Sequence, residues 1–111
     1  QNDAKEPKTD IFVHSEKFSY EILTTKVLSK RMMPVLLKIE PQGQSAKEQN
    51  QIGSEKFYFI LEGDVEVFIG EHSFKLTKNN TVYFDASEPH HLVNLGNEMA
   101  RILCVSTPVS L

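Results

Sequence analysis

The stretch YFILEGDVEVFIG, residues 58–70, decides the fold. Apolar Val65, Val67 and Ile69 alternate with the residues between them, which is the period-two pattern of a strand with two distinct faces. Gly63, in the middle of the stretch, can adopt the positive φ that a tight turn requires. The stretch therefore predicts two strands joined by a hairpin turn at residues 62–64.

Further short segments of strand character lie on both sides of this stretch. Most are rich in Val, Ile, Phe, Tyr and Thr, and none keeps helical spacing for the roughly twelve residues that a stable helix needs. Tight turns are predicted at residues 70–72 and 77–80. The expected strands are residues 11–13, 18–25, 35–40, 56–62, 65–70, 73–76, 82–85, 91–94 and 101–106. Many short strands without helices indicate an all-β sandwich or small barrel.

The composition is that of one globular domain. The chain has 111 residues, 40% of them hydrophobic and 24% charged, with a net charge of −3. Residues 1–10 are polar and include Pro7, so we expect a tail or linker there and one domain over residues 11–111. A chain without a basic stripe is not expected to contact nucleic acid itself, and one without a long apolar run is not expected to enter a membrane. The single Cys104 lies in an apolar run and forms no internal disulfide, which favours a reducing compartment.

Two short motifs carry a family resemblance. The first family motif, G-x5-H-x-H-x4-E-x6-G, matches this chain at Gly43 and Gly63, but its ligand positions hold Gln49, Gln51 and Lys56. The chain resembles the cupins, whose small jelly-roll barrel is defined by this motif and a second one.

The second family motif, G-x5-P-x-G-x2-H-x3-N, matches this chain at His90 and Asn94. Asn79, Asp85 and Ser87 stand at its earlier landmarks. The resemblance implies that the fold is a cupin double-stranded β-helix, an all-β jelly-roll barrel.

The C-terminal half, residues 57–108, is similar to the cupin sensor domain of helix-turn-helix transcriptional regulators of the xenobiotic-response-element type. The corresponding segments are residues 83–87, 89–90, 95–97, 100–101 and 107–108. This resemblance implies a non-catalytic, ligand-sensing domain of a cytoplasmic homodimer. The DNA-binding helix-turn-helix would precede Gln1, and DNA would be contacted through that attached domain.

The paired histidines of SEPHHLVN, residues 87–94, suggest a metal site. Successive side chains of a strand point to opposite faces, so His90 and His91 cannot both enter the barrel, and the motif assigns the inward position to His90. The other ligands would be Gln49, Gln51 and Lys56, but neutral amides are poor ligands and an ammonium repels a cation. We therefore expect no metal and no other cofactor.

Without a metal, these positions offer hydrogen-bond donors around a cavity that suits a small polar or anionic effector. The predicted ligand-binding residues are alternate positions on two strands: Gln51, Lys56, Tyr58, Ile60, His90 and Leu92. In the alternative interpretation, Lys56 extends to the rim, His90 is a core histidine and side chains fill the barrel.

Two other functions remain open. One is a stand-alone metal-dependent cupin enzyme, a dioxygenase or isomerase, which the residues at the ligand positions argue against. The other is a dimerisation module whose barrel binds nothing. A small molecule that raises thermal stability would separate the sensor from the dimerisation module.

Overall fold

The computed structural model describes residues 10–15, 17–25 and 30–109. In this part of the chain there are nine strands and no helix, and hence no helix that could cross a membrane. The predicted tail, residues 1–10, lies almost wholly outside the described residues. The strands are β1 (Asp10–Ser15), β2 (Phe18–Ile22), β3 (Met33–Ile39), β4 (Glu55–Glu62), β5 (Val65–Ile69), β6 (His72–Leu76), β7 (Thr81–Asp85), β8 (His90–Asn94) and β9 (Ala100–Thr107).

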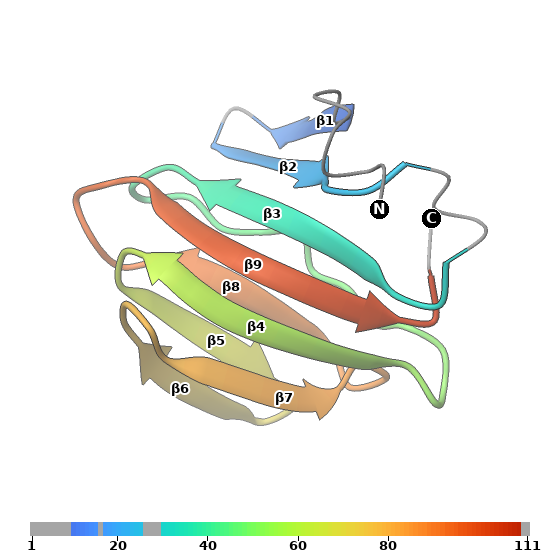
Figure 1. Cartoon of the computed structure of the whole chain (residues 1–111). Coiled ribbons are helices and arrows are strands. Elements are labelled where there is room, and N and C mark those ends of the chain that lie inside the picture. The colour runs from blue at the N-terminus through green and yellow to red at the C-terminus, as the bar shows by residue number, and fades with distance from the viewer. Residues whose placement is uncertain (1–9, 16, 26–29, 110–111) are drawn as a thin grey trace.

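The strands form two layers that face each other (Figure 1). One layer is a six-stranded sheet in the order β1-β2-β3-β9-β4-β7, and the other is a three-stranded sheet in the order β6-β5-β8. Every pairing is antiparallel. The prediction of an all-β sandwich or small barrel is confirmed.

The predicted hairpin at residues 62–64 is wrong in one respect. The turn is present and Gly63 has a φ of 105°, but β4 pairs with β7 and β9 while β5 pairs with β6 and β8. The turn therefore carries the chain from one layer to the other. Alternation along a strand reveals a buried face but not the partner strand, and for this reason the sequence pattern suggested a hairpin.

The other two predicted turns are confirmed. Gly70, with a φ of 59°, joins β5 to β6, and these two strands do form a hairpin. Between β6 and β7, the amide of Asn80 donates to the carbonyl of Thr77 (2.9 Å) and Asn79 has a φ of 74°.

The core fills the space between the layers. Ile39, Ile60, Leu92 and Ile102 come from β3, β4, β8 and β9 and are fully buried there. Each is one member of an alternating run, so its neighbours in the chain point to the other face of the sheet. Burial of a side chain of this size stabilises the fold by about 1.5–3 kcal/mol.

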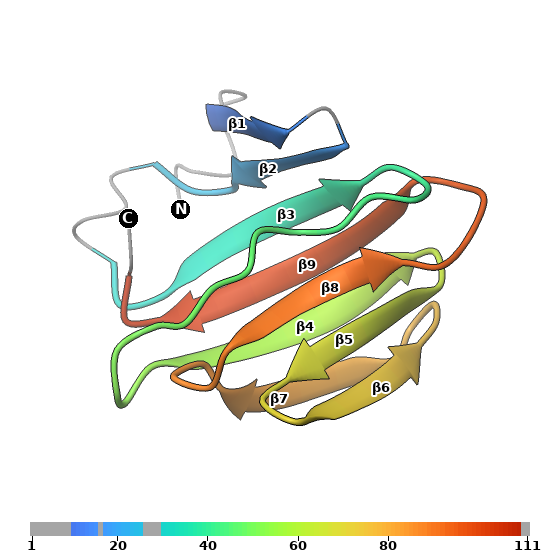
Figure 2. The ribbon, with the colours of Figure 1, turned by 180° about the vertical axis from the view of Figure 1, so that it is seen from behind.

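The segment between β3 and β4 forms no strand but runs beside β8, as Figure 2 shows. The amide of Ser45 donates to the carbonyl of Leu92 (2.8 Å), and Glu48 and His90 exchange two backbone hydrogen bonds (2.8 and 2.9 Å). These bonds fix one wall of the cavity described next.

Candidate functional site

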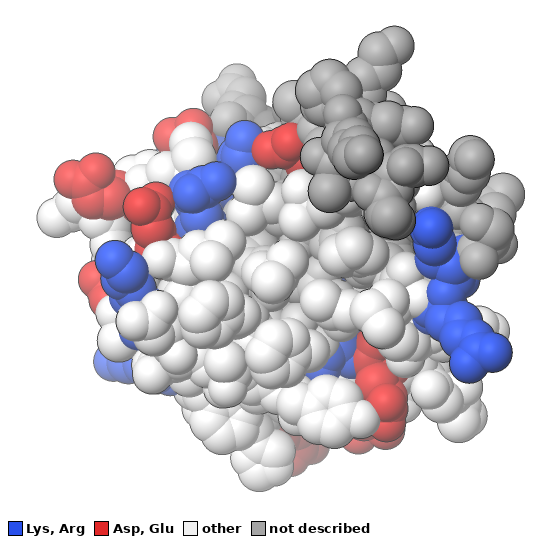
Figure 3. Space-filling view, in the orientation of Figure 1, with Lys and Arg blue, Asp and Glu red and all other residues white. Residues whose placement is uncertain are grey.

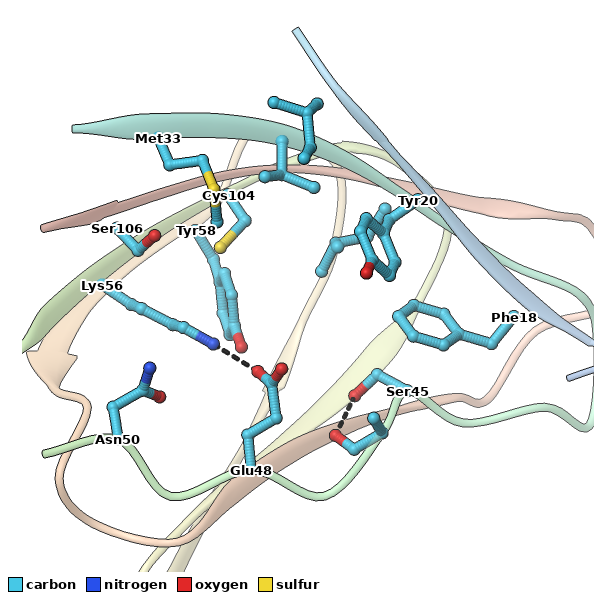
Figure 4. A pocket seen from close by; sticks show the side chains of 14 residues that line it. Phe18, Tyr20, Met33, Ser45, Glu48, Asn50, Lys56, Tyr58, Cys104 and Ser106 are labelled. Carbon is cyan, nitrogen blue, oxygen red and sulfur yellow. Dashed lines mark hydrogen bonds and ion pairs between the residues drawn. The ribbon is translucent and has the colours of Figure 1, made fainter. Parts of the chain in front are cut away.

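A pocket of about 410 Å³ lies between the inner face of the six-stranded sheet and the segment 45–50 (Figure 4). Its walls come from β2, β3, β4, β9 and the segment 45–50. The lining residues are Phe18, Tyr20, Ile22, Met33, Val35, Leu37, Ser45, Ala46, Glu48, Asn50, Lys56, Tyr58, Cys104 and Ser106. A cavity of this size suits a small organic molecule.

The buried ammonium of Lys56 is the central charge of the pocket. Its side chain is only 8% exposed, and the ammonium donates one hydrogen bond to Oε1 of Glu48 and one to Nε2 of His90 (2.9 Å). The alternative interpretation is therefore wrong for Lys56, which does not extend to the rim. Its description of His90 as a core histidine agrees with a side chain that is buried and does not line the pocket.

The imidazole of His90 is held in one orientation. Its Nδ1 lies 2.7 Å from the carbonyl oxygen of Glu88, and its Nε2 lies 2.9 Å from Nζ of Lys56. The ring of Phe84 packs edge-on against it, with 5.1 Å between the centroids. His91 points to the opposite face of β8 and stacks on Phe68, with 4.7 Å between the centroids.

Glu48 forms the outer half of the ion pair, and its side chain is 51% exposed. The contacts with His90 and Lys56 lower the pKa of Glu48 to about 2, although partial burial opposes the shift. The Glu48 carboxylate is thus ionised at neutral pH, and the pair carries no net charge.

The Tyr58 hydroxyl and the Cys104 thiol remain protonated. Burial, with a contribution from Cys104 and Glu48, raises the pKa of Tyr58 well above its usual value. Burial also raises the pKa of Cys104 to about 12. A thiol in that state is a small apolar group and not a nucleophile.

The residues at this position do not fit a metal. The Lys56 ammonium lies between the two groups that could ligate one, the carboxylate of Glu48 and Nε2 of His90. Among the described residues, no group of three or more His, Cys, Asp or Glu gathers at one point. An ammonium therefore fills the place where a cation would be coordinated, and the donor set lacks a third competent ligand.

The six predicted site residues do not share one environment. Lys56 and Tyr58 line the pocket, and His90 lies directly behind Lys56 in contact with it. Ile60 and Leu92 are fully buried in the core and do not line the pocket.

Gln51 is a correction, because it is exposed and does not line the pocket. Gln49 is exposed as well, and Glu48 and Asn50 point inward instead. The family motif placed the inward positions one residue too far along. This segment is irregular, and its backbone pairing with β8 sets the direction of its side chains. The motif spacing, which is counted from Gly43, therefore does not identify the inward residues.

Several pocket residues were missed by reasoning from the sequence. Those on strands, such as Val35, Cys104 and Ser106, follow from alternation once one inward residue of each strand is known. Glu48 and Asn50 lie outside any strand, and no spacing rule identifies them.

Comparisons with known proteins agree on the fold. Residues 35–106 match the family model of the cupin domain. An uncharacterized protein of Methanocaldococcus jannaschii is 34% identical over 70 residues, which make up 63% of this chain and 56% of that protein. The chain thus spans little more than half the length of this relative.

Solved structures of several functional classes have the same fold. A Thermus thermophilus protein is 28% identical, with a TM-score of 0.75 over 86% of this chain and 87% of that one. The cupin domain of an XRE family transcriptional regulator from Enterobacter cloacae is 14% identical, with a TM-score of 0.77 over 86% of this chain and all of that one. A sugar phosphate isomerase of the cupin superfamily from Silicibacter pomeroyi is 17% identical, with a TM-score of 0.77 over 92% of this chain and 73% of that one.

Proposed function

The chain belongs to the cupin family, and on that basis we propose that it is the effector-binding domain of a transcriptional regulator and works without a metal. One observation carries the proposal: the Lys56 ammonium lies between Glu48 and His90 at the polar end of an open pocket. Such a pocket has the size and polarity to bind a small organic molecule. A metal-dependent enzyme would need a metal ion as its Lewis acid, and the described residues of the pocket do not supply enough side chains to coordinate one.

The proposal includes parts outside this chain. A helix-turn-helix domain attached before residue 1 would contact DNA, and the protein would act in the cytoplasm as a homodimer. The dimer would exist in two arrangements that differ in DNA affinity. An effector that binds one arrangement more tightly than the other would shift the population toward it and so change the DNA affinity. The shared fold of the Enterobacter cloacae regulator domain supports this reading.

The other candidate is a metal-dependent enzyme, a dioxygenase or an isomerase. The Silicibacter pomeroyi isomerase has the same fold, so the fold alone does not separate the two classes. The donor set favours the regulator, since Glu48 and His90 are the competent ligands around Lys56 in the described part of the chain.

A thermal-shift screen of small metabolites on the purified chain tests the proposal. We expect a compound that raises the melting temperature of the wild type and raises that of Lys56→Met less. Glu71→Gln changes an exposed turn residue and is the control, which should respond as the wild type does. The compound should then change the DNA affinity of the full-length natural protein. Conversion of the compound by the purified chain, or an unchanged DNA affinity, would overturn the proposal.

A further inference from the structure

The pocket has two chemically different ends. Figure 4 shows Lys56, Asn50 and Ser106 on one side of it and the rings of Phe18 and Tyr20 on the other. Most of the remaining apolar wall comes from β2 and β3, with further contributions from Ala46, Tyr58 and Cys104. A ligand that fills this space has an apolar body and a polar head group.

The polar end has unused hydrogen-bonding capacity. An ammonium has three N–H donors, and the bonds of Lys56 within the described residues engage two of them. In the same part of the chain, the buried Oδ1 of Asn50 has no hydrogen-bond partner. A buried acceptor without a partner costs about 1–3 kcal/mol, so a ligand that donates to it gains affinity.

The two partners of the ion pair differ in their freedom to move. Lys56 is held on β4 with its side chain 8% exposed, whereas Glu48 lies outside any strand with its side chain 51% exposed. The Glu48 carboxylate is already partly hydrated, so it can turn into solvent at a small cost in free energy. Lys56 cannot, because its side chain is buried and an ammonium there is stabilised by an anionic partner. Another carboxylate inside the pocket could therefore replace Glu48 as the partner of Lys56.

We propose that the ligand is an apolar carboxylic acid with a hydrogen-bond donor beside its carboxylate, as in a 2-hydroxy acid, and that its carboxylate displaces Glu48 from Lys56. The hydroxyl donates to Oδ1 of Asn50, and the apolar body packs against Phe18 and Tyr20. Glu48 occupies the ligand's position in the empty pocket. The inference rests on the proposed function, because it names the chemical class of the effector.

Calorimetric titration with three matched compounds tests the inference: 3-phenyllactate, 3-phenylpropanoate, which lacks the hydroxyl, and 3-phenylpropanamide, which lacks the charge. On the wild-type chain, 3-phenyllactate should bind several-fold more tightly than 3-phenylpropanoate and at least about tenfold more tightly than the amide. Glu48→Gln removes the competing carboxylate, so it should strengthen the binding of both acids by about tenfold and leave the amide unchanged.

Two further variants separate charge from structure. Lys56→Met should abolish the preference for acids over the amide, and Glu71→Gln, an exposed control, should change nothing. Circular dichroism of each variant verifies that it is folded. Because Glu48→Gln tests the inference by a gain of affinity, a loss of folding in Lys56→Met does not decide the result.

The results that overturn the inference are distinct from those that overturn the proposed function. Equal binding of acid and amide to the wild type, or weaker binding of acids to Glu48→Gln, contradicts the inference. If no acid binds any variant but the metabolite screen yields an effector of another class, the inference is wrong and the proposed function stands. If neither experiment yields a ligand, both are wrong.

Discussion

Lys56 is the residue around which the candidate site is organised. It contacts Glu48 from an irregular segment and His90 from β8, so three separate parts of the chain meet at one ammonium. The same three residues explain why the pocket has a defined polar end and why that end is neutral overall.

The Glu48 carboxylate should contribute stability that depends on pH. The pKa of Glu48 falls from 4.5 to about 2 on folding, so its contribution is fully present above pH 4.5 and is lost as the pH falls toward 2. Because its side chain is half exposed, we expect a contribution of only about 1 kcal/mol. Thermal unfolding of the wild type and Glu48→Gln from pH 7 to pH 3 measures it. The advantage of the wild type should shrink below pH 4.5, and a constant difference across this range would contradict the assignment.

Gly63 should not tolerate a side chain. Its φ is 105°, and a Cβ there would lie 2.9 Å from both Cα and Cβ of Ala100. Gly63→Ala should lower the free energy of unfolding by about 2–4 kcal/mol, because backbone strain and overpacking add.

Gly53 provides the matched control for this substitution. Its φ is 95°, but a Cβ there would have no neighbour within 4 Å. Gly53→Ala should therefore cost only about 1 kcal/mol. Urea unfolding of both variants compares them, and equal losses of stability would show that the close approach to Ala100 is unimportant.

Among the elements, the connection from β8 to β9 depends on the side chain of Asn94. Its Nδ2 donates to the carbonyl oxygens of Ile39 and Glu98, and its Oδ1 accepts from the amide of Gly96, all at 2.8 Å. These bonds tie the end of β8 to the end of β3 and to the turn before β9. The Asn of the second cupin motif is thus a structural residue in this chain.

Asn94→Asp should destabilise the fold by about 3 kcal/mol, because it removes both donors and places a carboxylate against two carbonyl oxygens. Asn97→Asp, an exposed change of the same kind three positions along, should have almost no effect. Chemical denaturation of the two variants measures the difference. Similar stabilities would show that the hydrogen bonds of Asn94 do not hold the connection in place.

The elements also show how far prediction from sequence reached. Alternation correctly predicted the strands, glycine and polar residues marked the turns between them, and the second motif placed His90 inward. Pairing between strands distant in sequence is invisible to a local pattern, so the assignment of β4 and β5 to different sheets was missed. The inward direction of Glu48 and Asn50 was missed because they lie in a segment whose conformation is set by backbone bonds to β8.

For the whole molecule, the outer face of the six-stranded sheet carries an apolar surface. The strand register places Val105, Phe57 and Tyr83 in one row, and Leu103 and Phe59 lie on the same face in the next row. Figure 3 shows this face as largely uncharged at its centre, with charged side chains near its margins. Exposed apolar faces of this kind usually mark protein interfaces. We therefore expect two copies of the chain to pair through it.

Sedimentation equilibrium tests the expected dimer. Tyr83 is 66% exposed on this face, and in a two-fold dimer Tyr83→Glu would place two carboxylates at the interface. The wild type should sediment as a dimer and Tyr83→Glu as a monomer. Phe74→Glu is the control, because Phe74 is 46% exposed on β6 of the other sheet, and this variant should remain dimeric. A monomeric wild type would contradict the expected pairing.

The central claim is that an ammonium takes the place of the cupin metal and leaves an organic-ligand pocket. Metal analysis of the wild type and Lys56→Glu, after incubation with zinc, manganese, nickel or ferrous iron and removal of the excess, tests it most directly. Lys56→Glu replaces the ammonium with a carboxylate beside Glu48 and His90, so that variant should retain metal, whereas the wild type should retain only traces. One equivalent of metal on the wild-type chain, lost on His90→Ala, would contradict the claim.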